Sequence, residues 1–218
     1  MRKKIQFTDG YEMIPGTFYG IGQNYAKHAA EMGSQVSPEP TVFIKPPSSL
    51  VNDGDIIVLP KFSANIHHEV ELVVVIGIDC DNIEASEAID VIAGYGVGID
   101  ITLRDIQNKA KSEGKPWAIA KGFRNSAPIS KILPASQFKS IPDFELELWI
   151  NEELRQSGTT KDMERSVGEL VAFLSNVFGL RAGDIIFTGT PEGVGQIVSG
   201  DKLRAKLCQF VELNVTAI

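Results

Sequence analysis

The sequence predicts an α+β fold: a strand-rich mixed β-sandwich or roll with short peripheral helices. Three Gly-Asp turns, within residues 52–58, 182–187 and 199–203, each lead directly into an apolar or alternating run. Strands and helices are also mixed without a regular strand-helix-strand rhythm, which argues against a doubly wound sheet. With 218 residues, 43% of them hydrophobic, the chain can bury one core. We therefore expect a single domain over 1–218, with residues 1–18 as a short N-terminal appendage.

Composition excludes several classes of partner. The net charge of -7, with both signs intermixed, lacks the basic stripe that nucleic acid or an anionic membrane needs. The longest apolar runs, such as 72–78, are far shorter than the roughly 20 residues of a membrane span. Residues 1–4 are basic, but polar residues interrupt any apolar signal segment after them, so we expect a cytoplasmic protein. Cys80 and Cys208 form no CxxC pair and predict neither a disulfide framework nor a thiolate zinc site.

In the first half of the chain, one helix and two strands are predicted. Residues 24–33 read as a short helix, with Asn24 as its N-cap and Gly33 just past its end. Residues 66–77 turn into a continuous apolar strand. Residues 94–100 form a Gly-punctuated strand that delivers one carboxylate at its end.

The second half continues the mixed pattern. A helix is predicted from Thr102, as N-cap, to about Gly114, with an apolar stripe facing the core. Residues 144–150 alternate polar and apolar side chains and lead into a hairpin. Residues 163–178 have apolar side chains at helical spacing, and this helix ends near Gly179.

An acidic pair suggests a metal site. Glu69 and Glu71 project from the same face of a strand, because strand side chains alternate. Two like charges that close resist burial unless a cation compensates them. The alternative is a solvated strand end, but Asp100 at the end of the glycine-rich strand offers a third ligand. Such hard oxygen ligands suit magnesium, manganese or calcium.

Further polar side chains are candidates for binding and catalysis. Arg104 and Gln107 share a helix face, from which Arg104 suits a substrate carboxylate, although an exposed face would show the same spacing. His28 and Glu31 can touch across one helical turn, as a general base with its orienting carboxylate or as an ordinary surface pair. Lys121 stands among apolar neighbours, either aimed into a pocket towards developing negative charge or snorkelling to the surface.

Three other chemistries lack their motifs. The loop 188–195 can offer hydroxyls and N-H groups to an anion, but it lacks the Gly-Lys-Ser/Thr ending of a P-loop. Residues 20–22 and 96–98 are only fragments of a dinucleotide fingerprint. No Gly-x-Ser-x-Gly elbow occurs either, so nucleotide, nicotinamide and serine-hydrolase functions are disfavoured.

Together these motifs resemble the fumarylacetoacetate hydrolase superfamily, and within it the small acylpyruvate hydrolase and oxaloacetate decarboxylase branch. The resemblance extends from about residue 20 to the C-terminus, and it rests on residues 24–32, 43–46, 68–72, 94–107, 121–123 and 188–195. It implies a rolled β-sandwich like the C-terminal domain of that family, usually assembled as a homodimer.

The resemblance also implies roles for individual residues. Magnesium would be held by Glu69, Glu71 and Asp100. Water would be activated by His28 with Glu31, and Lys121 would stabilise the oxyanion or enolate. The substrate would be contacted by Arg104, Gln107 and Thr190, with Lys45 lining the same pocket.

We therefore expect a metal-dependent enzyme acting on a small anionic keto acid. The first expectation is magnesium-dependent hydrolysis of the carbon-carbon bond of acylpyruvates, of the acetylpyruvate or fumarylpyruvate class, giving pyruvate and a carboxylic acid. The alternatives are oxaloacetate decarboxylation, oxaloacetate keto-enol tautomerisation, or isomerisation or decarboxylation of a diacid from aromatic degradation. A different class is a non-enzymatic β domain in which the metal serves only folding.

Overall fold

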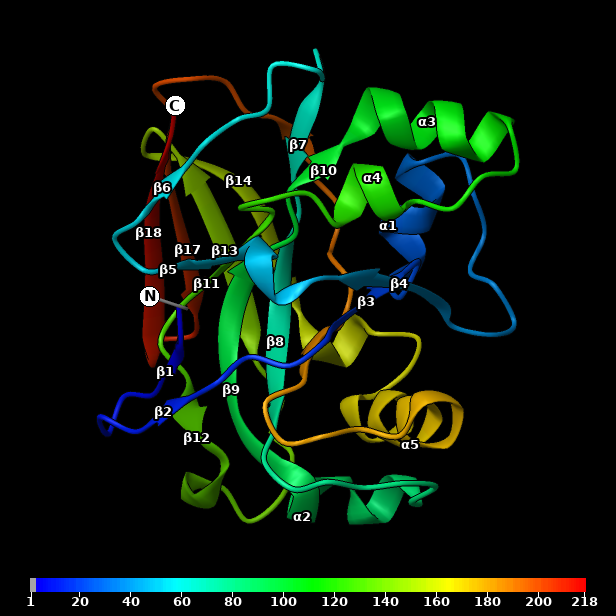
Figure 1. Ribbon diagram of the computed structural model, residues 1–218, viewed down its shortest axis with the longest axis vertical. Coiled ribbons are helices and arrows are strands. Elements are labelled where there is room, and N and C mark those ends of the chain that lie inside the picture. The colour runs from blue at the N-terminus through cyan, green and yellow to red at the C-terminus, as the bar shows by residue number, and fades with distance from the viewer. Residues whose placement is uncertain (1–2) are drawn as a thin grey trace.

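A computed structural model describes residues 3–218 and confirms the predicted fold: curled sheets with short helices on one side (Figure 1). The largest sheet has eight strands, in the order β4-β3-β15-β8-β9-β11-β5, with β12 also paired to β9. Their bounds are β3 Phe18–Gly22, β4 Thr41–Lys45, β5 Leu50–Asn52, β8 Val70–Ile76, β9 Ile92–Ile99, β11 Ala127–Ile129, β12 Leu133–Pro134 and β15 Ile185–Phe187. The antiparallel pair β8 and β9 forms the buried centre of this sheet.

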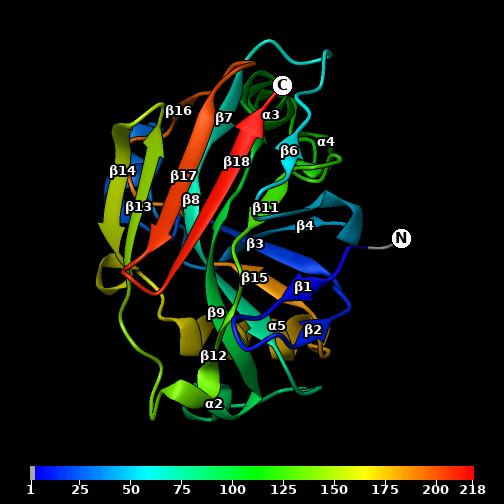
Figure 2. The same ribbon diagram turned by 90° about the vertical axis from the view of Figure 1, so that its left-hand side faces the viewer.

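A second sheet packs over β8 and β9 and faces the viewer in Figure 2. Its five strands follow the order β14-β13-β17-β18-β6. Their bounds are β6 Ile56–Ile57, β13 Glu145–Ile150, β14 Glu153–Thr159, β17 Lys202–Leu207 and β18 Val211–Ala217. Alternate side chains of β13, β17 and β18 point inward, so the main core lies between the two sheets.

Two small sheets complete the strands. One has the order β10-β7-β16, with bounds β7 Ile66–His68, β10 Thr102–Leu103 and β16 Gly195–Gln196. The other pairs β1 Ile5–Gln6 with β2 Glu12–Met13. Ile5 and Phe7 are buried in a second apolar cluster together with Phe18 and Phe187, so this first hairpin packs on the large sheet.

The helices are short and lie at the periphery. Their bounds are α1 Ala26–Glu31, α2 Ala88–Val91, α3 Arg104–Ser112, α4 Ala118–Lys121 and α5 Val167–Phe178. Single 3₁₀ turns occur at Pro47–Ser49, Ala85–Glu87, Ala135–Gln137 and Thr160–Asp162. In Figure 1, α1, α3 and α4 gather around one end of the large sheet, and α5 lies beside its other end. Among residues 3–218, no helix has the length and apolar character needed to cross a bilayer.

Local sequence signals located most elements correctly. The three Gly-Asp turns open β6, β15 and β17 as predicted. Asn151 and Glu152 have φ angles of 52° and 69°, the left-handed backbone that joins twisted antiparallel strands in a tight hairpin. The predicted helix over 163–178 starts later, at Val167, because Ser166 and Glu169 form a reciprocal capping box. It ends at Phe178, before Gly179, as predicted.

Two predicted helix caps are wrong. Asn24 does not cap α1; its side-chain amide donates to the carbonyl oxygens of Thr188 and Arg165 instead. Thr102 does not cap α3; its hydroxyl accepts from the Lys121 ammonium at 2.7 Å. Both side chains are buried, where partners distant in sequence outcompete the nearby helical N-H groups.

Candidate metal and substrate site

The structure brings Glu69, Glu71 and Asp100 together at one end of the large sheet. Glu69 stands at the break between β7 and β8, and pairing of Val70 with Ile99 sets the end of β9 beside it. Carboxylate oxygens from the three residues lie within 4.8 Å of one another. Their exposed fractions are only 5%, 1% and 0%, so they do not form a solvated strand end.

Three buried cations surround these carboxylates. The Lys121 ammonium lies 2.8 Å from Glu69 Oε2 and 2.5 Å from Asp100 Oδ2. On its other oxygen, Asp100 meets the Lys45 ammonium at 2.7 Å. The Arg104 guanidinium forms an ion pair with Glu69. Two of the three carboxylates are therefore charge-compensated by the protein itself.

Glu71 is the exception. Within residues 3–218, no cation lies within ion-pair distance of Glu71, and the only hydrogen bond to its carboxylate comes from the Gly189 backbone N-H at 2.7 Å. Burial, together with the charges of Asp100 and Glu69, raises the pKa of Glu71 well above its ordinary value. Burial acts in the same direction on Glu69, but there the charges of Lys121 and Arg104 dominate and hold its pKa well below the usual range.

This donor set fits a hard divalent cation. Convergent carboxylate oxygens are the ligands that Mg²⁺, Mn²⁺ and Ca²⁺ prefer, and the uncompensated Glu71 supplies the charge that such an ion would neutralise. The Lys121 ammonium already lies between Glu69 and Asp100, which shows that positive charge is favourable at this point. Glu69, Glu71 and Asp100 are thus the residues able to hold a metal.

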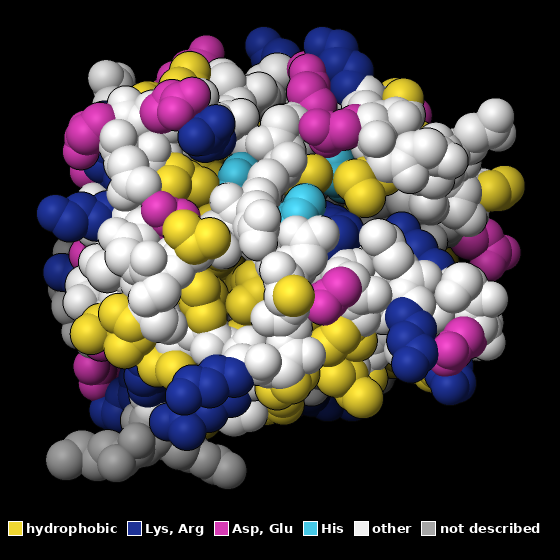
Figure 3. All heavy atoms as spheres, turned by 90° about the horizontal axis from the view of Figure 1, so that it is seen from above, with side chains coloured by type: hydrophobic (Ala, Val, Ile, Leu, Met, Phe, Trp, Pro, Cys, Tyr) yellow, Lys and Arg dark blue, Asp and Glu magenta, His cyan; other side chains and the backbone are white. Residues whose placement is uncertain are grey.

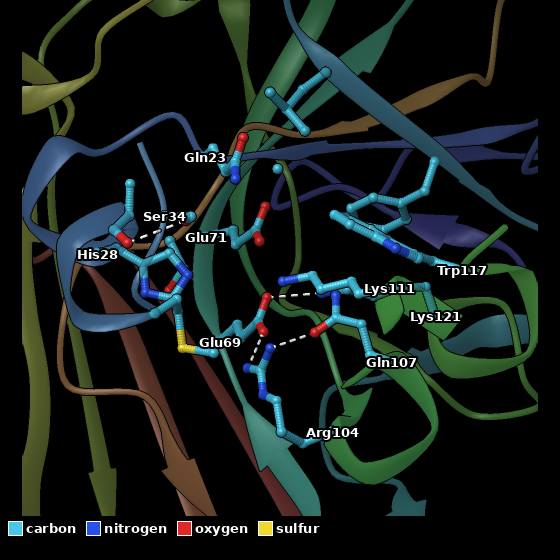
Figure 4. A pocket seen from close by; sticks show the side chains of 16 residues that line it. Gln23, His28, Ser34, Glu69, Glu71, Arg104, Gln107, Lys111, Trp117 and Lys121 are labelled. Carbon is cyan, nitrogen blue, oxygen red and sulfur yellow. Dashed lines mark hydrogen bonds and ion pairs between the residues drawn. The ribbon is translucent and has the colours of Figure 1, made fainter. Parts of the chain in front are cut away.

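A pocket opens directly above the carboxylates, and its empty space, open solvent included, is about 440 Å³. Its polar lining comes from the start of β8, from α1, α3 and α4, and from the loops that follow β3, α1 and β15. It comprises Gln23, His28, Ser34, Glu69, Glu71, Arg104, Gln107, Lys111, Lys121 and Thr190. In Figure 4 the two glutamates lie at the centre, with His28 on one side and Trp117 on the other. Viewed from above, histidine side chains lie near the middle of this face, beside recessed Lys or Arg side chains (Figure 3).

His28 and Glu31 form a contact pair at the cavity wall. His28 is 8% exposed and lines the cavity, whereas Glu31 lies behind it. Glu31 Oε2 lies 3.2 Å from His28 Nδ1, and Glu31 also accepts the Gly193 N-H at 3.1 Å. Glu31 is therefore held from the loop after β15 and can fix the orientation of the imidazole, with Nε2 left for a ligand.

Arg104 and Gln107 also face the cavity, and they are buried, not exposed. Arg104 Nη1 donates to Gln107 Oε1 at 2.6 Å, while Arg104 Nε is buried with no partner among residues 3–218. An unsatisfied guanidinium N-H next to a cavity is suited to an incoming carboxylate. Thr190 lines the cavity as well, and its hydroxyl accepts a hydrogen bond from Gln156 at 2.8 Å.

Lys45 is the one predicted substrate residue that the structure does not bring to the cavity. It is fully buried, pairs with Asp100, and donates to the carbonyl oxygens of Ser126, at 3.0 Å, and of Lys121. A side chain with these partners positions the metal-site carboxylate and the α4 backbone. It has no surface left for substrate.

Gln156 is a functional candidate that no local sequence pattern indicates. This buried β14 side chain accepts the Val70 N-H at 3.0 Å, bonds His68 Nδ1 at 2.9 Å and donates to Thr190. Through these hydrogen bonds, Gln156 fixes β8, beside the metal-site glutamates, relative to the loop that carries Thr190. A glutamine in a largely exposed strand gives no local signal of this role, because its partners lie 34 to 88 residues away.

This fold, with a buried acidic cluster below a cation-lined cavity, is that of the fumarylacetoacetate hydrolase family. The chain belongs to that family: the family model described as the fumarylacetoacetate hydrolase C-terminal domain matches residues 17–217. The resemblance found in the sequence motifs is thereby confirmed.

Among its relatives, the chain is 47% identical to the oxaloacetate tautomerase YcgM of Escherichia coli over 184 residues, covering 84% of each chain. It is 42% identical to a mitochondrial oxaloacetate tautomerase of Arabidopsis thaliana over 194 residues, which is 89% of this chain and 87% of the relative. A solved structure of fumarylpyruvate hydrolase from Pseudomonas aeruginosa, in complex with Mn²⁺ and pyruvate, superposes with a TM-score of 0.94. It is 35% identical, and the match covers 100% of this chain and 96% of that one.

Proposed function

We propose that this protein is a divalent-metal-dependent enzyme that interconverts the keto and enol forms of oxaloacetate. The observation that carries this proposal is the buried Glu69, Glu71 and Asp100 cluster directly below a cavity lined by Arg104 and Lys121. Anionic ligands for a metal and cationic donors for a keto acid thus meet in one small space. Similarity to two oxaloacetate tautomerases over most of the chain supports the choice of substrate.

The reaction requires a proton to leave and rejoin the carbon between two carbonyl groups. A divalent cation at the carboxylate cluster would withdraw electron density from the keto acid and so acidify that carbon. Arg104 and Gln107 bind the substrate carboxylate and fix its orientation. His28, held by Glu31, accepts the proton and returns it.

Lys121 stabilises the negative oxygen that develops as the proton leaves. Burial works against its charge, but Asp100 and Glu69 raise the pKa of Lys121 above the ordinary value. The side chain therefore stays an ammonium at neutral pH, a hydrogen-bond donor and not a base. Its burial, at 2% exposed, strengthens its interaction with an oxyanion.

One observation favours a second candidate, hydrolysis of acylpyruvates. An imidazole oriented by a carboxylate, as in the His28 and Glu31 pair, is the usual means of activating water, and decarboxylation has no need of it. The likeness to fumarylpyruvate hydrolase points the same way. The same cavity would bind an acylpyruvate through its keto-acid end.

A single substrate panel tests both functions. Loss of enol absorbance is followed for oxaloacetate, acetylpyruvate and fumarylpyruvate with Mg²⁺ or Mn²⁺, and then with chelator, while a coupled assay detects released pyruvate. We expect metal-dependent ketonisation of oxaloacetate without pyruvate release. Pyruvate release from an acylpyruvate would support the hydrolase instead, and no acceleration of any substrate would refute both.

The variant His28→Gln separates catalysis from metal binding. We expect it to lose at least about a hundredfold in kcat, because general acid-base catalysis contributes about that much or more. Divalent-metal affinity, measured by calorimetry, should stay within about twofold of the wild type. Unchanged turnover would show that His28 is not the base, and metal binding without any turnover in the wild type would favour a non-enzymatic domain.

A further inference from the structure

One cation in the cavity has no counterpart in the protein. Lys111, in α3, lines the cavity at its exposed edge, and its ammonium lies 5.0 Å from the centre of the Trp117 ring. None of the acidic side chains of residues 3–218 lies within ion-pair distance of it. By contrast, Arg104 and Lys121, the other two cations of the lining, each contact Glu69.

The position of Lys111 follows from helix geometry. Arg104, Gln107 and Lys111 are spaced by three and four residues along α3, so they share one face of the helix. Arg104 and Lys111 are separated by only about 20° around the helix axis and by about 10 Å along it. Their side chains thus form a row that runs from the carboxylate cluster to the mouth of the cavity.

The charges of the site show what this row can bind. In number, the cations Lys45, Lys121 and Arg104 equal the carboxylates Glu69, Glu71 and Asp100, although none of the three cations pairs directly with Glu71. A divalent metal would therefore bring two positive charges in excess, and Lys111 brings a third at the outer end of the cavity. A monoanionic keto acid would balance only one of them and leave Lys111 without a partner. A second carboxylate on the substrate would satisfy it.

We propose that Lys111 is a specificity-determining residue, which binds the distal carboxylate of a dicarboxylic 2-keto acid and so selects diacids over monoacids. The proposal deepens the proposed function and rests on the same cavity. The Trp117 ring holds the ammonium from one side by a cation-π contact, which limits its freedom before the substrate arrives. Arg104 and Gln107 receive the keto-acid end, and Lys111 the far end.

Matched ester substrates give a direct test of turnover. We would measure kcat and KM of wild type, Lys111→Gln and Lys111→Arg with oxaloacetate and with its 4-ethyl ester, in which an uncharged ester replaces the distal carboxylate. Lys111→Gln should raise KM for oxaloacetate about tenfold, equivalent to about 1.4 kcal/mol, and change KM for the ester by less than about twofold. Lys111→Arg should retain most of the diacid preference, since it keeps the charge.

Lys109→Gln is the matched control, because it removes the same charge from the same helix at a side chain outside the cavity lining. Lys109→Gln should leave kcat and KM unchanged for both substrates. The diacid preference of the wild type should also weaken as ionic strength rises, because the Lys111 ammonium is exposed to solvent. Equal effects of Lys111→Gln on the diacid and the ester, or no effect on either, would overturn the proposal.

A binding measurement keeps the proposal independent of the reaction. Calorimetry of the metal-loaded protein would compare 2-oxoglutarate with its 5-methyl ester, neither of which has the acidic carbon between two carbonyl groups that the proposed reaction uses. If oxaloacetate is not turned over but Lys111→Gln still removes the preference for the diacid, the proposed function fails and the role of Lys111 stands. If turnover occurs and no diacid preference exists, the role of Lys111 fails and the function stands.

Discussion

Replacement of Lys45 by methionine should destabilise the metal-free protein strongly. The ammonium is fully buried, 2.7 Å from Asp100, and it also donates to the Ser126 carbonyl and hydroxyl at 3.0 Å. Methionine has a similar volume, so the change removes charge and donors without opening a large cavity. Breaking a buried ion pair costs about 3 to 5 kcal/mol, because the remaining charge has no compensation. In a chain of this size, each kcal/mol lowers Tm by roughly 2 to 4 °C, so Tm should fall by roughly 6 to 20 °C.

Binding of a divalent metal should restore part of the stability that Lys45→Met removes. If Asp100 is a metal ligand, a bound cation supplies the positive charge that Lys45→Met removes, and it binds only the folded state. Thermal unfolding of wild type and variant would be followed by circular dichroism, in chelator and in saturating Mg²⁺. Lys4→Met is the control, since Lys4 forms an exposed pair with Glu12 and its loss should cost less than about 0.5 kcal/mol. A Lys45→Met loss below about 1 kcal/mol, or one equally large with and without metal, would refute the reasoning.

Three more predictions follow from other buried or paired groups. Glu71→Gln should raise Tm in chelator, because it removes an uncompensated buried carboxylate, yet weaken Mg²⁺ binding at least about tenfold by calorimetry; a lower Tm would contradict this. Gln156→Leu should lower the free energy of unfolding, measured in urea, by about 2 to 3 kcal/mol. It should also raise KM, because the Thr190 hydroxyl loses its hydrogen-bond donor; an unchanged KM would show that Gln156 does not position Thr190 for substrate. Burial raises the pKa of Asp105, but hydrogen bonds from Ser63 and neighbouring N-H groups outweigh burial and lower it. The stability that ionised Asp105 contributes is therefore present above its unfolded pKa of about 3.9 and is lost as pH falls through the folded value. Asp105→Ala should thus be less stable than wild type at pH 7 by about 1 to 2 kcal/mol, with the gap closing below about pH 4, and a gap independent of pH would show that ionisation is not involved.

Features read from local pattern were largely determined by the sequence. The turn-to-strand entries before β6, β15 and β17, the hairpin at Asn151, and the end of α5 before Gly179 all depend on neighbours within a few residues. The strand period also put Glu69 and Glu71 on one face, and the motif set as a whole identified the family. Such signals survive in the sequence because backbone dihedrals and side-chain alternation are local properties.

Only the tertiary structure decided which polar groups meet. Lys45 was expected in the substrate pocket, but β4 delivers it to Asp100, which lies 55 residues further along the chain. Asn24 and Thr102 had the residue types of helix caps, yet buried partners far away in sequence bind them more effectively. The same holds for Gln156 and for the unpaired charge of Lys111. Ion pairing and desolvation depend on distances in space, and these are set only when the sheets curl and close the cavity.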